Sequence, residues 1–180
     1  MPQPLASIRK ALRRFRRNRR GSAAVEFALV APVFFALLFA IIETAMVFFA
    51  SQVLETVTQD SARQIMTGQA QTAAYKTVDD FKTNVVCPRI SVLFDCKNGI
   101  SVDVQSYPQF SAVSITAPID GSGSFVPPNN YDPGGSGNIV VVRLFYQWPL
   151  FVTGLGYNIS NLKNNMRLLT ATAAFQNEPF

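Results

Sequence analysis

The residues best placed for a chemical reaction are Gly21 and Ser22, where a basic segment meets an apolar one. Glycine has no Cβ, so a protease working at a membrane surface could approach the carbonyl of Gly21 closely. The side chains that follow, from Ser22 to Ala24, are small and add little crowding. Cleavage of this bond would remove the basic segment and leave an α-ammonium on Ser22. We interpret Gly21 and Ser22 as a candidate processing site at which the chain is the substrate.

Glu26 lies just inside the apolar segment, and Phe27 follows it. An unpaired carboxylate at the centre of a bilayer costs on the order of 2.5–3.5 kcal/mol, and less near an interface. The new ammonium of a neighbouring subunit would relieve this cost by pairing with the carboxylate. We therefore predict that Glu26 and Phe27 take part in subunit assembly. The alternative is a glutamate that lies among the lipid headgroups beside Arg19 and Arg20.

The composition excludes several classes of enzyme. The 180 residues contain no histidine, which removes the commonest general base, Ser-His-Asp triads and most zinc sites. Two cysteines alone are too few for a zinc or iron–sulfur site. Asp79 and Asp80 are adjacent on a predicted helix and point to different faces, so they do not form an acid–base pair. We predict no enzymatic activity, no cofactor and no metal site.

Positive charge is concentrated at the start of the chain. Residues 1–20 hold eight of the 16 basic residues and none of the 11 acidic ones, so the overall charge of +5 conceals a charge of −3 in the rest. Basic residues beside an apolar span face the cytoplasm, and we predict that residues 1–21 form a cytoplasmic leader. An arm that binds nucleic acid or anionic lipid is the alternative. The rest of the chain has no basic, aromatic-rich face, so we predict no nucleic-acid partner.

An apolar segment follows the leader. Its sixteen uncharged residues, Phe27–Ile42, would span about 24 Å as a helix, which is short of a hydrocarbon layer of about 30 Å. Extension to Ala50 gives about 36 Å and takes Glu43 to a position near the opposite interface. We predict a transmembrane half at residues 22–50, kinked at Pro32 because proline removes one helical hydrogen bond. A secretory signal peptide cleaved near Ala50 is the alternative.

Beyond the span, the helical pattern continues with apolar residues on one face only. Gly68 predicts the helix end, so a single helix from Ser22 to Thr67 would be about 69 Å long. The one-sided stripe predicts that the helix extension 51–67 packs on a globular domain, which we place at residues 51–180 outside the cytoplasm. The stripe comprises Ala50, Val53, Leu54, Val57, Ser61 and Ile65.

The remaining sequence predicts one small α+β domain. Residues 72–86 have the period of a short amphipathic helix that ends at Cys87 and Pro88. Residues 118–138 are rich in glycine and proline and predict an exposed loop outside the core. Three or four antiparallel strands packed on the helix stripe would bury both surfaces, so the expected fold is a long N-terminal transmembrane and amphipathic helix on a small antiparallel sheet. Strands are predicted at residues 100–105, 113–115, 139–148 and 167–175.

Cys87 and Cys96 enclose eight residues and follow the predicted span. The charge argument puts both on the oxidising side of the membrane, where disulfides persist. We therefore predict a disulfide between them. A redox-active pair is the alternative, but the spacing is not the C-x-x-C that such pairs use.

The junction also carries a recognisable pattern. A basic leader ends at Gly21, small residues follow, Glu26 is the fifth residue after the glycine, and an apolar stretch contains Pro32. The run Arg-Arg-Gly-Ser-Ala-Ala-Val-Glu-Phe resembles the processing site of type IV pilin-like precursors. The longer pattern through Pro32 is similar to the TadE-like proteins of tight-adherence (Tad/Flp) pili. The segment from Thr170 onward resembles the closing segment of the same family.

The resemblance implies a pilin-like fold and a minor pilin or pseudopilin that takes part in assembling a tight-adherence pilus for surface adhesion. The implied partners are a prepilin peptidase, a major Flp-type pilin, other minor pilins, an inner-membrane assembly platform and membrane lipid. The implied location is the bacterial inner membrane with a cytoplasmic N-terminus and a periplasmic C-terminal domain, and incorporation into the extracellular pilus stays open. The alternatives are a type II secretion pseudopilin and an unprocessed, signal-anchored periplasmic binding domain.

Overall fold

A computed structural model provides the structure of the chain. It describes residues 13, 15, 21–90, 93–152 and 157–180, so most of the predicted leader lies outside the described residues. The chain divides into two compact units, Met1–Ile42 and Glu43–Phe180. One helix, α2, contributes residues to both units because it runs from Ser22 to Met66.

Helix α2 (Ser22–Met66) is 45 residues long, which corresponds to about 68 Å, and it matches the predicted helix to within one residue at its C-terminal end. Gly68 follows it in the left-handed conformation, with φ of 74°. A Cβ at this position would lie 2.5 Å from the ring of Phe180. Glycine is therefore required here by both backbone conformation and space.

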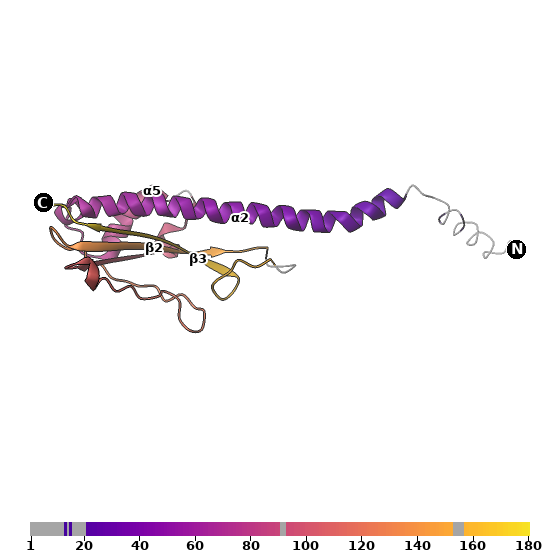
Figure 1. Cartoon of the computed structure of the whole chain (residues 1–180). Helices are drawn as coiled ribbons and strands as arrows, with labels where there is room; N and C mark the ends of the chain where they lie inside the picture. Colours follow the sequence, from indigo (N-terminus) through magenta and orange to yellow (C-terminus); the bar gives the residue numbers. More distant parts are fainter. Residues whose placement is uncertain (1–12, 14, 16–20, 91–92, 153–156) are drawn as a thin grey trace. The chain divides into compact units, whose positions relative to one another are not determined.

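Three strands form one antiparallel sheet in the order β1-β2-β3 (Figure 1). They are β1 (Ile100–Tyr107), β2 (Ile139–Pro149) and β3 (Met166–Gln176). β2 and β3 consist largely of β-branched and other apolar residues, which suit a pleated, packed surface, whereas β1 alternates apolar and polar residues over most of its length. The predicted α+β fold is confirmed.

The main core lies between the sheet and the part of α2 that follows Glu43. Alternate residues of each strand point to this side, as the period of two requires. The buried helix residues confirm the predicted stripe, with Val47, Thr58 and Ala62 added and Val53 only partly buried. The core combines Val47, Ala50, Leu54, Val57 and Ile65 of α2 with Val102, Val104, Val140, Val142, Leu144, Leu169, Ala171 and Ala173 of the sheet.

The opposite face of the sheet is also covered. Asp103 and Arg143 are paired across β1 and β2, and both side chains are buried. Arg143 donates from Nη2 to Asp103 Oδ2 at 2.7 Å and from Nη1 to the carbonyl of Thr116 at 3.0 Å. Asn130 Nδ2 donates to Asp103 Oδ1 at 2.8 Å. Loop residues therefore complete a buried ion pair on a face that the alternating pattern of β1 predicts to be polar.

One prediction about the connection between β1 and β2 was wrong. The structure has no strand at residues 113–115, because Asn130 and Asp132 take the outer edge of β1 through backbone hydrogen bonds with Val104. The glycine- and proline-rich loop 118–138 has no helix, no named strand and no buried residue, as expected of an exposed loop, although three of its partly buried side chains, Ile119, Phe125 and Tyr131, pack against the core clusters. Its Tyr131 packs on Phe81, with ring centroids 5.5 Å apart, and burial raises the pKa of the Tyr131 hydroxyl to about 12.

The predicted helix at residues 72–86 was wrong in its bounds. The chain forms α3 (Gln69–Thr72), then α4 (Val78–Phe81), the π-helical turn η2 (Lys82–Val86) and α5 (Cys87–Ile90). Thr77 and Asp80 form a reciprocal capping box that starts α4. Pro88 does not end the run of helical turns. The wider π-helical turn η2 precedes it and accommodates the helical hydrogen bond that proline cannot donate.

Replacement of Arg143 by alanine tests the buried ion pair. It would leave the carboxylate of Asp103 buried without a cation, so we expect the free energy of unfolding to fall by about 3–5 kcal/mol. Urea unfolding of the full chain in detergent measures this loss. Lys163→Ala removes an exposed cation and should change stability by less than about 0.5 kcal/mol.

The paired variant Arg143→Met with Asp103→Leu should recover most of the loss, because a buried ion pair replaced by apolar groups is often neutral in stability. An unchanged Arg143→Ala variant would contradict the importance of the pair. A double variant as unstable as the single one would show that packing, rather than the unpaired charge, is responsible.

Candidate processing and assembly site

Gly21 immediately precedes α2 and is exposed. A Cβ added at Gly21 would meet no heavy atom within 4 Å, and its backbone is not in the left-handed region. Neither space nor conformation in this chain therefore requires a glycine at position 21. Ser22, the predicted residue on the other side of the cleaved bond, is the first residue of α2 and is also exposed.

Glu26 lies one helical turn beyond Ser22. The Ser22 hydroxyl donates to Glu26 Oε1 at 3.0 Å, and both side chains are exposed. Phe27 is exposed as well. The predicted processing and assembly residues thus share one accessible stretch at the start of α2, where, within the described part of the chain, the Glu26 carboxylate accepts a local hydrogen bond from Ser22.

Pro32 lies inside α2, which continues without a break on both sides of it. The kink expected there stays a prediction. The helix is long and apolar enough to cross a membrane. Most of the large apolar side chains of this segment are exposed, including the neighbouring rings of Phe34, Phe35 and Phe39. Such a surface fits contact with lipid chains better than contact with water.

Glu43 is the residue whose contacts sequence reasoning missed. It was expected near the far membrane interface without a specific partner, but its side chain is only 8% exposed. Its carboxylate accepts hydrogen bonds from the backbone N–H groups of Phe151 and Val152. The neighbouring Thr44 hydroxyl is hydrogen-bonded to the hydroxyl of Tyr157. The signal available in the sequence was a lone carboxylate in an apolar helix, which must find a donor when buried.

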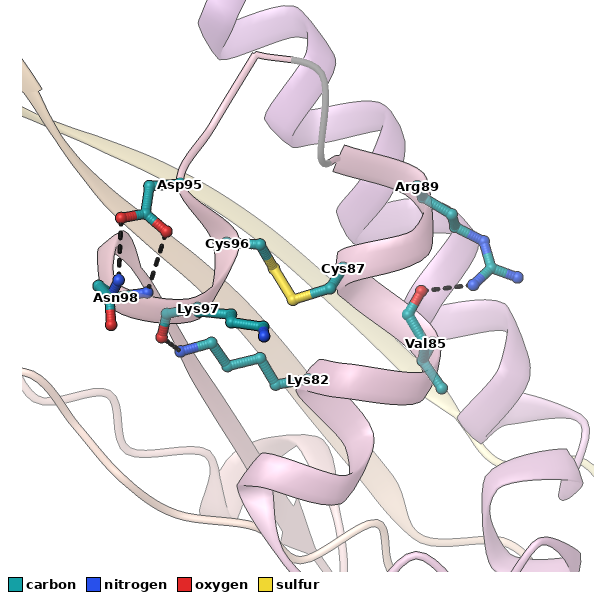
Figure 2. The surroundings of a disulfide bond; sticks show 8 residues. All are labelled: Lys82, Val85, Cys87, Arg89, Asp95, Cys96, Lys97 and Asn98. Atoms are coloured by element: carbon teal, nitrogen blue, oxygen red, sulfur yellow. Dashed lines mark hydrogen bonds between the residues drawn. A yellow bond between two sulfur atoms is a disulfide. The ribbon is translucent and has the colours of Figure 1, made fainter.

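The predicted disulfide between Cys87 and Cys96 is present, with the two Cα atoms 5.5 Å apart. Figure 2 shows that it joins α5 to the short helix α6 (Cys96–Gly99), which leads directly into β1. Lys82 Nζ in η2 donates to the carbonyl of Lys97 in α6 at 2.8 Å and so links the same two parts of the chain. The disulfide thus ties the helical segment that follows α2 to the start of the sheet.

Asp95 caps α6 by accepting hydrogen bonds from Asn98, both from its side chain and from its backbone N–H (Figure 2). These bonds, with that from the Asn98 side chain first, lower the pKa of the Asp95 carboxyl below its usual value. The carboxyl is fully exposed, so we interpret it as a local cap rather than as a reactive group. Among the described residues, no cluster of three or more Cys, Asp or Glu side chains could hold a metal ion.

A family model described as TadE-like protein matches residues 21–63. The match begins at Gly21 and ends within α2, so it covers the junction and the long helix. It confirms the resemblance to TadE-like proteins and supports a pilus-associated protein of a structural rather than catalytic family. No match was found among the curated proteins or among the solved structures.

Alkylation of the denatured chain tests the disulfide in solution. We expect Cys87 and Cys96 to resist alkylation until a reductant is added, as measured by intact mass. Cys96→Ser should lower the free energy of unfolding by roughly 2–3 kcal/mol, because it releases a short closed loop in the unfolded state. Two thiols that alkylate freely without reductant would contradict the bond and an exported location for this domain.

Proposed function

We propose that this chain is a minor pilin or pseudopilin that takes part in assembling a tight-adherence pilus. The family match that starts at Gly21 and follows α2 is the observation that carries the proposal. The exposed junction, the apolar helix and the one-sided packing of its later part all fit such a subunit. The chain serves as a structural component and as a protease substrate.

In the first proposed step the chain inserts into the bacterial inner membrane, and its basic leader stays on the cytoplasmic side. The positive charge before Gly21 supports a cytoplasmic N-terminus, and the disulfide supports an exported domain. A prepilin peptidase then cleaves after Gly21 and releases Ser22 as the new N-terminus. An open backbone at Gly21 supports this role, since nothing in the chain itself calls for a glycine there.

Assembly then brings the helices of neighbouring subunits together. Glu26 and Phe27 are exposed in the single chain and are free to contact a partner helix. We propose that the Glu26 carboxylate pairs with the new ammonium of a neighbouring major Flp-type pilin or minor pilin. The sizeable exported domain favours a minor subunit over the main fibre subunit, because the major pilins of these systems are very short.

Gly21→Leu tests the processing step. The bulky side chain should block cleavage by crowding the scissile carbonyl, yet it should leave insertion intact because the position is open. We expect full-length protein from this variant, against a wild-type chain that begins at Ser22, by intact mass and N-terminal sequencing of membrane-purified protein. Val25→Leu, which places the same leucine side chain at an exposed position one turn away, should be cleaved normally.

Recovery of an uncleaved wild-type chain from cells with an active prepilin peptidase would contradict the proposal and favour a signal-anchored domain. A chain that begins near Ala50 would instead identify a signal peptide.

Glu26→Gln tests the assembly role, because it preserves size and hydrogen bonding but removes the charge that an ammonium needs. A hydrogen bond to a charged group contributes about 1.5–3 kcal/mol, so we expect subunit association to weaken about ten-fold or more. Pilus counts and crosslinking between subunits measure the effect, while insertion and cleavage should be unchanged.

Ser22→Ala is the matched control for this experiment. It removes the hydroxyl that bonds Glu26 within the chain and keeps both the carboxylate and the new ammonium. Piliation should stay close to that of the wild type. Normal piliation and crosslinking in the Glu26→Gln variant would contradict the assembly role and indicate that Glu26 lies among the lipid headgroups.

A further inference from the structure

The contacts of Glu43 join the long helix to the connection between β2 and β3. Two successive backbone N–H groups, those of Phe151 and Val152, point at one carboxylate that is almost fully buried. Thr44 and Tyr157 add a second side-chain link between the same two parts of the chain. The segment that begins at Leu150 is therefore held at the helical residue where the second compact unit starts.

The position of Glu43 in the sequence places this contact directly after the apolar stretch. Ser22–Ile42 contains 21 residues, which as a helix correspond to about 31 Å, close to the roughly 30 Å of a hydrocarbon layer. Glu43 directly follows this stretch. Because its carboxylate is satisfied by backbone donors of the domain, it meets neither lipid nor water as a free charge. A membrane exit at Ile42, earlier than Ala50, fits both observations.

Phe151 is oriented unlike the residue before it. Leu150 is buried at 7% exposure, whereas Phe151 is 85% exposed, the highest value among the large hydrophobic residues described from Glu43 onward. Its backbone N–H is bound to Glu43, so its ring is held close to the level at which the helix leaves the apolar stretch. Aromatic side chains at this depth insert into the boundary between headgroups and acyl chains.

We propose that Phe151 anchors the exported domain to the outer surface of the membrane, and that Glu43 is the positioning residue that holds it there. The proposal rests on the insertion of α2 that is part of the proposed function. Its ligand is the bilayer interface in which the chain's own helix is embedded. We favour lipid over a protein partner because Glu43 directly follows the apolar stretch on the same helix. The distance of Glu43 from the membrane surface is therefore limited by the rise of that helix. Phe48 and Phe49, both exposed, continue the apolar surface of α2 past Glu43.

The test uses tryptophan fluorescence of the full-length chain in phosphatidylcholine–phosphatidylglycerol vesicles without any peptidase. Trp148 is the single tryptophan, so Trp148→Phe gives a silent background. Phe151→Trp in this background should show blue-shifted emission and strong quenching by lipids brominated near the headgroup end of their acyl chains. Adding Glu43→Ala should reduce both effects. Glu43→Gln should retain them better, because its amide oxygen still accepts the two N–H groups.

Phe110→Trp in the same background is the matched control. Phe110 is 63% exposed and follows Tyr107, which pairs with Ile139 at the start of β2, whereas Phe151 follows the end of that strand. An 11-residue strand separates the two positions by about 36 Å. The indole of the Phe110→Trp variant should therefore have the red emission of a solvent-exposed group and should not be quenched by the brominated lipids.

Vesicle flotation distinguishes a failure of the proposed anchor from a failure of membrane insertion. If the Phe151→Trp chain floats but its indole is unquenched, or is quenched no more than that of the Phe110→Trp control, the anchor is overturned and the proposed pilus function stays intact. A blue shift that depends on protein concentration and not on brominated lipid would also overturn it, in favour of contact with another subunit. A chain that does not float would contradict the insertion on which both proposals rest.

Discussion

Helix α2 must meet two different environments along one unbroken backbone, and the rest of the molecule is arranged around this constraint. Before Glu43 its large apolar side chains are mostly exposed. After Glu43 one stripe is buried against the sheet, while the other faces carry Met46, Phe48 and Phe49 at first and mainly polar residues from Ser51 onward. A helix can do both because its backbone hydrogen bonds are internal, so only the side chains change environment. The boundary between the two compact units falls at this change of side-chain pattern.

Buried carboxylates organise the connecting segments of the domain. Glu43 binds the backbone that follows β2, and Asp103 binds Arg143 and Asn130 beneath the long connection between β1 and β2. A buried charge without donors is costly, so each carboxylate favours the one loop conformation that satisfies it. The glycine- and proline-rich connection is held on the domain both by these hydrogen bonds and by the packing of Ile119, Phe125 and Tyr131.

The start of α2 differs from both of these regions. Gly21, Ser22 and Glu26 are exposed, and the hydrogen bond between Ser22 and Glu26 is local to one helical turn. Among the described residues, neither space nor backbone conformation requires a glycine at position 21. All three residues lie within the stretch that the TadE-like family model matches.

The amino-acid sequence determined the features whose causes are local or periodic. The extent of α2, its end at Gly68, the three strands and the disulfide partners could be predicted, because helix and strand periods, glycine conformation and cysteine spacing act over a few residues. The candidate processing residues also come from a short pattern, and their role stays a prediction. Tertiary structure alone decided the partners of Glu43 and Asp103, which lie far along the chain, since these depend on strand register and on how loops return to the sheet. It also determined that residues 113–115 form no strand, because the backbone of Asn130 and Asp132 is hydrogen-bonded to Val104 at the edge of β1.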